Sequence, residues 1–277
     1  RRVLRTTSGG RTHGPGALHT LTFEDTPRHF VANDVMRSHI GAMLSSVFPE
    51  GEDFFVRSVR AYRDRLDDPT LQQQVKGFIG QEAVHGREHR NFNDHLATLG
   101  YPTRFVDRVT KRGLALLNKT SPRVFQLAVT AALEHYTATL AEALLRDERA
   151  RDEFGTGEIR ALFTWHALEE SEHKAVAFDV FETVSGNRAI RVGTMMAVHV
   201  VFLLAMTVAV AHSVLLDWRS WPKVPASLWR LRSHVFFQPE IIGRLLDYNK
   251  AGFHPDDHDT DDLMVEWRQR YEDGLAA

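Results

Sequence analysis

The chain has 277 residues, of which 43% are hydrophobic and 25% charged, so it is long enough for one large domain or a domain with an appendage. Its formal net charge of -2 gives no electrostatic basis for binding nucleic acid, which we exclude as a partner. The absence of cysteine excludes disulfides, iron–sulfur clusters and thiolate zinc sites.

The N-terminal third predicts an arm followed by two helices. Residues 1–27 are rich in Gly, Thr, Arg and Pro and have no apolar period, which is typical of an extended arm. Apolar spacing predicts a helix over residues 28–47 that Pro49 ends. A second helix is expected from the FPEGEDFF segment to about residue 66.

One carboxylate of this second helix lies on its apolar face. Glu52 shares a face with Phe55, Val56 and Val59, at spacings of three, four and seven. Glu50 falls at the predicted helix start, where a carboxylate interacts favourably with the helix dipole. Glu52 is therefore the candidate for a functional carboxylate.

The third predicted helix has polar residues at positions expected to be buried. It begins after the turn at residues 67–70 and ends near residue 99. Its inward positions, in steps of four and three, are Leu71, Val75, Phe78, Glu82, His85, His89, Phe92 and Leu96. Burying a carboxylate and two imidazoles without partners would cost several kcal/mol each. The motif Glu82-x-x-His85, with His89 one turn later, therefore predicts a metal site.

Two further helices contribute one carboxylate between them. Residues 103–118 predict a short helix across the bundle, and Ser121-Pro122 begins a helix that reaches about residue 149. The inward positions of the longer helix are Leu127, Ala131, Glu134, Ala138, Ala141 and Leu145. Small residues around Glu134 leave room for an ion and its ligands.

A second Glu-x-x-His motif follows Gly155-Thr156-Gly157, in a helix expected to end near residues 185–187. The inward positions of this helix are Ile159, Phe163, His166, Glu170, His173, Ala177, Val180 and Val184. Two Glu-x-x-His helices, with one Glu from each of two others, are typical of four-helix bundles that hold two metals. We therefore predict an all-α, ferritin-like four-helix bundle over residues 28–187 with a di-metal site.

Residues 188–277 predict a hydrophobic helix and a short helical extension. No charged residue occurs in 192–216, a run long enough to span a bilayer, and Trp218, Trp221 and Trp229 follow among basic residues. The alternatives are a helix lying in one leaflet, one packed on the bundle, or a dimer seam. Short helices are expected at residues 241–248 and 264–271, and the intervening GFHPDDHDTDD predicts a solvated turn and helix cap in preference to a metal site.

The proposed ligands are Glu52, Glu82, His85, Glu134, Glu170 and His173. Four carboxylates and two imidazoles suit iron first, with manganese or zinc as alternatives; buried Glu–His pairs without metal are the other interpretation. His89 could add a seventh ligand. His166 is assigned to a supporting position, and the side chains expected to orient ligands or face solvent are His135, Glu169, Glu172 and Asp179.

Five blocks in order carry a family resemblance: FPEGEDFF, GQEAVHGREHRNFN, LEHYTA, WHALEESEHKAVAFDVF and GFHPDDHDT. Over roughly residues 26–271 the chain resembles the bacterial family labelled "predicted metal-dependent hydrolase", whose ligand pattern is ferritin-like. The resemblance implies as metal-site residues Glu52, Glu82, His85, His89, Glu134, Glu170 and His173. It implies a hydrolase only through the family's label.

Two mechanisms are compatible with these ligands. We favour a di-iron oxygenase or oxidase that uses dioxygen and an electron donor to oxidise an apolar or lipid substrate, because carboxylate-rich ligation suits such chemistry. The alternatives are hydrolysis with a water activated by two metals, for which we find no Arg or Ser clamp in the sequence, and a non-catalytic metal-binding scaffold. We expect a cytoplasmic homodimer, with membrane contact as an open alternative.

Overall fold

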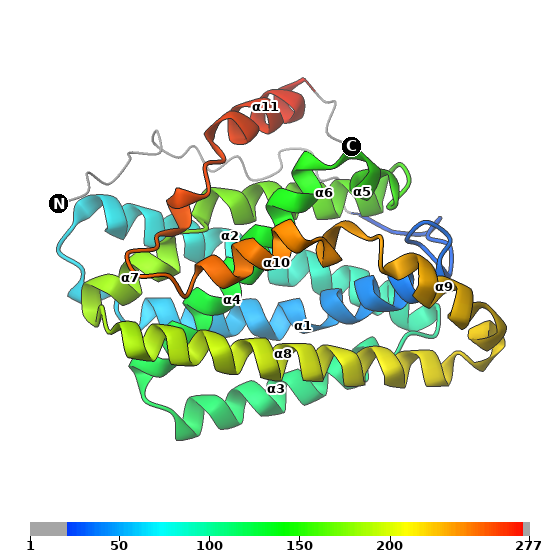
Figure 1. The fold of residues 1–277 in the computed structure, drawn as a ribbon, viewed down its shortest axis with the longest axis horizontal. Coiled ribbons are helices and arrows are strands. Elements are labelled where there is room, and N and C mark those ends of the chain that lie inside the picture. Colours follow the sequence, from blue (N-terminus) through cyan, green and yellow to red (C-terminus); the bar gives the residue numbers. More distant parts are fainter. Residues whose placement is uncertain (1–20, 274–277) are drawn as a thin grey trace.

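The fold is built from helices, most of which lie where the sequence predicted them, with differences at α1 and between α6 and α7. A computed structural model describes residues 21–273, and every regular element in that range is helical. The α-helices are α1 (Val35–Arg60), α2 (Pro69–Thr98), α3 (Thr103–Thr120), α4 (Arg123–Arg146), α5 (Glu148–Asp152), α6 (Glu158–His173), α7 (Val176–Val184), α8 (Arg188–Leu216), α9 (Val224–Leu231), α10 (Pro239–Asp247) and α11 (Asp261–Glu272) (Figure 1).

Helices α1, α2, α4 and the pair α6–α7 form the predicted bundle. Helix α1 packs chiefly on α2, and α4 packs on both α6 and α7. Along α2 the apolar residues fall into two buried clusters, one that includes Val75 and Phe78 and another that includes Phe92 and Leu96. The buried Glu82 and His85 lie between these clusters, so apolar side chains enclose the polar centre from both ends. The expectation of an all-α bundle with a buried Glu/His cluster is confirmed.

Helix α1 passes through Pro49, where the sequence predicted a break between two helices. Pro49 has no N–H with which to bond the Ser45 carbonyl, the usual cause of a helix break. Here the Asn93 side chain of α2 donates to that carbonyl at 2.9 Å, and the Ser45 hydroxyl donates back to Asn93 Oδ1 at 2.7 Å. The prediction was wrong because a neighbouring helix supplies the hydrogen bond that proline removes.

The start of α1 also differs from the prediction. The helix begins at Val35, since the Asp34 side chain accepts from the backbone N–H of Arg37 and caps the first turn. Of the predicted arm, residues 1–20 lie outside the described part of the chain. Leu21 and Phe23 are buried, and the Phe23 ring lies 4.8 Å from that of Phe92, so this part of the segment packs on the bundle.

The fourth metal-bearing helix is interrupted just after its motif. Helix α6 ends at His173 and α7 begins at Val176, where one continuous helix was predicted. Between them, the Lys174 ammonium donates to the His258 carbonyl at 2.6 Å and to the Thr260 hydroxyl at 2.9 Å. The interruption therefore coincides with the point where the C-terminal segment binds this helix.

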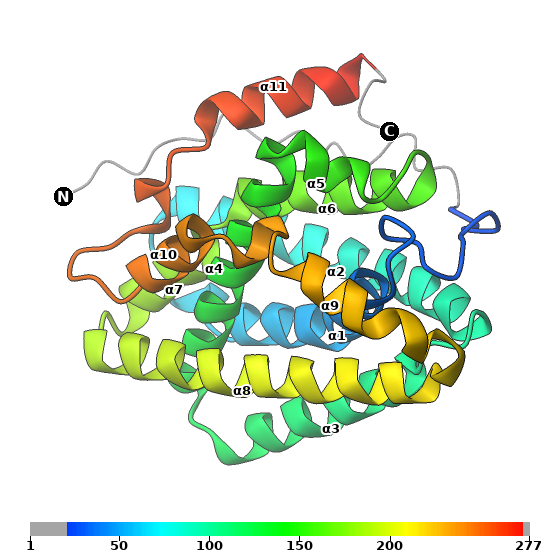
Figure 2. The same cartoon turned by 45° about the vertical axis from the view of Figure 1, so that its right-hand side comes forward.

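Helix α8 is the hydrophobic segment of the sequence, and it packs along α1 and α4. It runs beside α3 at one edge of the molecule in two views (Figures 1 and 2). Within the described residues it is the one helix long and apolar enough to cross a membrane, with a mean hydropathy of 2.2. The short helix α10 begins two residues before its predicted segment and ends one residue short of it, and α11 extends beyond its predicted segment at both ends.

Candidate metal centre

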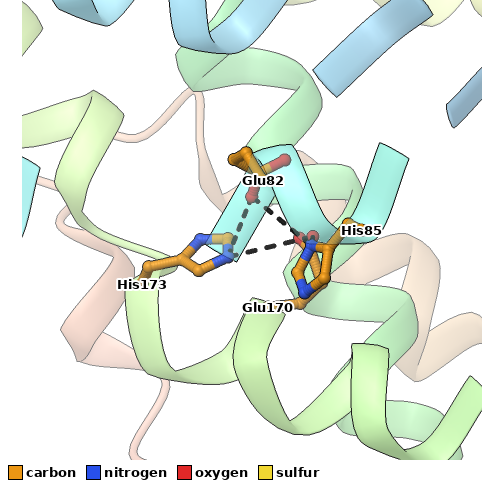
Figure 3. Close-up of side chains that lie close together, drawn as sticks. All are labelled: Glu82, His85, Glu170 and His173. Atoms are coloured by element: carbon orange, nitrogen blue, oxygen red, sulfur yellow. Dashed lines mark ion pairs between the residues drawn. The ribbon is translucent and has the colours of Figure 1, made fainter. Parts of the chain in front are cut away.

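Six acidic and imidazole side chains meet inside the bundle, five of them from the helices predicted to carry them and Glu52 from the single helix α1 that replaces two predicted helices. All are buried: Glu52 from α1, Glu82 and His85 from α2, Glu134 from α4, and Glu170 and His173 from α6. In α2 and α6 the three-residue spacing of Glu and His turns both side chains of each motif toward the same partner helix. Figure 3 shows the two motifs facing one another.

The two motifs form one compact group. Glu82, His85, Glu170 and His173 each offer one ligand atom, and these atoms all lie within 4.8 Å of one another (Figure 3). His173 Nε2 is 2.9 Å from Glu82 Oε1, and His85 Nδ1 is 3.5 Å from Glu170 Oε1. We call these four residues the first group.

A second group overlaps the first at His85. Glu52, His85 and His166 also offer ligand atoms within 4.8 Å of one another. The imidazole rings of His85 and His166 stack with centroids 4.2 Å apart, and His166 Nε2 lies 2.9 Å from Glu170 Oε1. We call these three residues the second group. Sequence reasoning assigned His166 to a supporting position, although its place on the inward seam of α6, one turn before Glu170, was the available signal.

Glu169 orients His85. Its Oε2 lies 3.0 Å from His85 Nε2, while its Oε1 accepts from the Trp165 indole N–H at 3.0 Å. A proton on Nε2 leaves Nδ1 of His85 with its lone pair directed at Glu82 and Glu170. This contact is the one that the orienting role expected for Glu169 would require.

Glu134 does the same for the other motif. Its Oε2 lies 3.1 Å from His173 Nδ1, which leaves Nε2 of the ring facing Glu82. Glu134 is outside the two groups that share ligand distances, yet its second oxygen, Oε1, is buried and has no hydrogen-bond partner among the described residues. One carboxylate can therefore both position an imidazole and offer an oxygen to an ion.

His89 has partners for both ring nitrogens. Its Nδ1 lies 2.9 Å from the Ser45 hydroxyl, and its Nε2 lies 2.6 Å from His166 Nδ1. Burial, and then the nearby His166 and His85, hold the pKa of His89 well below its usual range, so this imidazole is neutral. His166 is thus a member of the second group, whereas His89 contacts His166 and belongs to neither group. The ligand role expected for His89 stays a prediction.

Many polar atoms in this centre have no hydrogen-bond partner. Those that the described residues leave without one are Glu52 Oε1 and Oε2, Glu82 Oε1 and Oε2, His85 Nδ1, Glu134 Oε1, Glu170 Oε2 and His173 Nε2. An unpartnered buried carboxylate or imidazole costs several kcal/mol, and a native fold keeps such atoms only where something else binds them. All of them are acceptors or can be, and they converge, so the donor set fits metal cations.

The protonation pattern points the same way. Burial, and then the charge of Glu82, raise the pKa of Glu52 well above its usual range. Burial, followed by the charges of Glu170 and Glu82, raises the pKa of Glu134 to about 8. Burial alone would lower the pKa of His173, but the carboxylates of Glu82 and Glu134 outweigh it and hold the pKa well above normal. The centre therefore attracts protons when no cation is bound, and a metal ion would replace them.

The remaining predicted side chains lie outside the centre. His135 Nε2 bonds the Arg244 carbonyl, and Glu172 pairs with Arg268 at 2.9 Å. Asp179 does reach an imidazole, that of His254 at 2.8 Å, where His254 caps the predicted C-terminal turn.

Glu50 is likewise outside the centre, but not where the sequence predicted it. It lies inside α1, away from the helix start, and its Oε1 pairs with Lys111 at 3.3 Å. The prediction of its position failed together with that of the break at Pro49.

A surface hollow reaches the centre between α1 and α2. Its volume is about 230 Å³, and it is lined by Pro49, Asp53, Val56, Glu82, Ala83, Gly86, Arg87 and Arg90. A Cβ at Gly86 would lie 3.1 Å from Glu52 Oε2, so the absence of a side chain at Gly86 leaves room for the Glu52 carboxylate beside the hollow. Charged side chains, including two arginines, surround an opening that leads to Glu82. The sequence alone did not reveal these arginines as a group.

Comparisons with known proteins agree with the geometry. No curated protein and no solved structure gives a significant match to the chain. The profile of one family, described as predicted metal-dependent hydrolase, matches residues 19–259, a range that includes all of the bundle and α8 to α10. With most of its length matched and a buried Glu/His cluster at its centre, the chain belongs to the predicted metal-dependent hydrolase family.

Proposed function

We propose that this protein is a hydrolase that uses two metal ions bound in the buried centre. The observation that carries the proposal is the convergence of eight unpartnered polar atoms from four helices, in a chain of this family. The proposed ligands are Glu52, Glu82, His85, Glu134, His166, Glu170 and His173. Mixed oxygen and nitrogen ligation suits iron, manganese or zinc.

The hollow between α1 and α2 supports hydrolysis of a substrate with an anionic group. Arg87 and Arg90 line it beside Glu82, and arginine binds carboxylates and phosphates through two parallel hydrogen bonds. The two arginines would act as the clamp that a hydrolase needs by exchanging their present carboxylate partners, Glu88 for Arg87 and Glu50 and Asp107 for Arg90, for the substrate. It also favours a partly polar substrate over the wholly apolar one expected from the hydrophobic helix.

The protein's own residues then divide the work. Arg87 and Arg90 would bind the anionic group at the mouth, and the small side chain of Gly86 would let the scissile bond approach Glu52 and Glu82. Glu169 and Glu134 hold the imidazoles of His85 and His173 in the orientation that ligation requires. When bound, the two ions would supply Lewis acidity and lower the pKa of water into the neutral range.

Dioxygen chemistry is a second candidate that one observation favours. Two Glu-x-x-His motifs on facing helices, with single glutamates from α1 and α4, are the ligand pattern of di-iron carboxylate bundles. Aromatic rings also enclose the imidazoles: Phe78 lies 4.9 Å from His173, and Trp165 lies 4.9 Å from His85. Such a shell would exclude water from an oxidant. This function would require an external electron donor.

One experiment separates the two candidates. Metal-free protein would be reloaded with zinc, manganese or ferrous iron and assayed with p-nitrophenyl phosphate and p-nitrophenyl acetate. The proposal predicts metal-dependent hydrolysis that E82A abolishes and that E172A, a change at an outward-facing carboxylate, leaves intact. R87Q with R90Q should raise KM for the phosphate ester and spare the neutral one.

The opposite result is equally readable. Two results together would overturn the proposal of hydrolysis in favour of oxidase chemistry. Neither ester would be hydrolysed with any of the metals, and the ferrous protein would show a transient visible absorption on mixing with dioxygen.

A further inference from the structure

Helices α3 and α8 both expose large apolar side chains. On α8 eight such side chains are exposed, and six of them, most three or four positions apart, are Met196, Val200, Leu203, Leu204, Val208 and Leu215. On α3 they are Phe105, Val109 and Leu116. The two helices lie side by side (Figures 1 and 2), and the Phe105 ring contacts His212 of α8 with centroids 4.8 Å apart. We call these nine residues the α3/α8 face.

The opposite side of α8 is fixed to the bundle by polar contacts along its whole length. Near its start, the Arg191 guanidinium bonds the Tyr248 carbonyl; at its middle, His199 bonds the Tyr136 hydroxyl; near its end, Ser213 lies 2.7 Å from His39 Nδ1. A helix spanning a bilayer would have to break these contacts and carry their polar groups into lipid. Helix α8 therefore stays on the bundle with one face open.

Positive charge and tryptophan border this face. Helix α3 carries five basic residues against one acidic residue, and Arg108, Arg112 and Lys119 each lie three or four positions from its exposed apolar side chains. Beyond α8, residues 218–239 contain four basic residues and no acidic one. Trp218 and Trp229 in this stretch are 63% and 65% exposed.

We propose that the α3/α8 face docks on the surface of a membrane that contains anionic lipids, with both helices lying in the plane of the headgroups. The proposal is independent of the chemistry at the metal centre. Apolar side chains would enter the acyl boundary, lysine and arginine stems would reach up to lipid phosphates, and tryptophan rings would sit at the headgroup level. This is the pattern of an interfacial helix, in which one face is apolar and its border is basic.

The basic residues around the α3/α8 face favour an anionic lipid surface over a second copy of the chain as its binding partner. In a symmetric dimer the same patch faces itself, so Arg108, Arg112 and Lys119, which have no carboxylate partner among the described residues, would be brought close to their own copies, while Lys111, Arg104 and Arg230 are already paired. An anionic leaflet neutralises these basic residues and so favours their approach to its surface. The exposed tryptophans also suit an interface that is apolar on one side and wet on the other.

Vesicle flotation of the full chain tests the proposal. We expect binding to mixed phosphatidylcholine–phosphatidylserine vesicles and weak binding to phosphatidylcholine alone. V200E with L204E should lower the partition constant more than about tenfold, since both side chains are largely exposed (65% and 63%) and lose burial in lipid. R112Q with K119Q should weaken binding only to the anionic vesicles.

Matched controls keep the test independent of folding. V265E adds a charge at a residue of α11 that is 68% exposed, and K76Q removes one from α2; neither should change binding. A wild-type chain that fails to float with either vesicle overturns the proposal. If it instead sediments as a dimer that V200E with L204E dissociates, the face is an interface between copies.

Discussion

The first and second groups of the buried centre differ in which of their ligand atoms already form hydrogen bonds within the protein. In the first group, His85 Nδ1 and His173 Nε2 have no hydrogen-bond partner among the described residues and face Glu82. In the second group, both ring nitrogens of His166 are engaged, one by His89 and one by Glu170. An ion entering the first group has to displace protons and the contact between His173 Nε2 and Glu82, whereas an ion entering the second must also displace the two hydrogen bonds of His166.

Two motifs with the same sequence pattern can therefore form metal sites of different affinity. The two Glu-x-x-His motifs are alike in sequence, but His166 and His89 crowd only one side of the centre. We therefore expect two ions of unequal affinity, with the tighter one in the first group. An unequal pair suits chemistry in which one ion stays fixed and the other exchanges.

The largest effect is expected from removing the carboxylates that both motifs contribute. E82A with E170A takes away two buried anions from the first group and the Glu170 carboxylate that contacts His166 of the second, so the protein should lose both ions. Elemental analysis per chain measures this. E172A, whose carboxylate pairs with Arg268, is the matched control and should retain full metal content. A double variant that still binds two ions would refute the assignment of the centre.

Single histidine variants test the inequality itself. H173A should weaken the tighter ion by more than about 100-fold, because a direct ligand matters more than its supporting residues. H166A should spare that ion and remove or weaken only the other. Calorimetric titration of metal-free protein with zinc resolves the two affinities. Equal losses in both variants would show that the groups are equivalent.

A smaller effect is expected from the carboxylate that orients His85. E169A removes the acceptor at His85 Nε2 and should weaken metal binding by about 10- to 100-fold, because the imidazole loses its fixed tautomer. E169Q keeps an acceptor oxygen and should lose less. If E169A and E169Q behave as the wild type does, Glu169 is not a positioning residue.

The smallest effect is expected in the pH dependence of folding stability, and it comes from His39, a buried histidine outside the metal centre. Burial, only partly offset by Asp217, lowers the pKa of His39 to about 4, whereas that of the unfolded chain is near 6.5. The unfolded state therefore binds more protons between these values, and the free energy of unfolding should fall as the pH drops from about 6.5 toward 4.

For His39 alone this loss should be on the order of 1 to 3 kcal/mol. Denaturant unfolding of metal-free protein at several pH values measures it, with H39Q as the comparison. A variant whose acid sensitivity equals that of the wild type would remove His39 from this account.

Sequence alone predicted the part of the centre that depends on helix periodicity. Glu82, His85, Glu170 and His173 could be placed together because spacing within a helix fixes the face on which a side chain lies. His166 and the arginines of the hollow depend on how different helices pack, which periodicity does not specify. The continuity of α1 through Pro49 likewise depends on a hydrogen bond from Asn93 of another helix.

Elemental analysis of the purified protein, with its absorption spectrum, tests the central claim most directly. Convergence of unpartnered carboxylate and imidazole atoms in the bundle predicts about two metal ions per chain. Protein expressed with ample iron, manganese and zinc that contains none would contradict the account, because the buried charges would then be stable without cations.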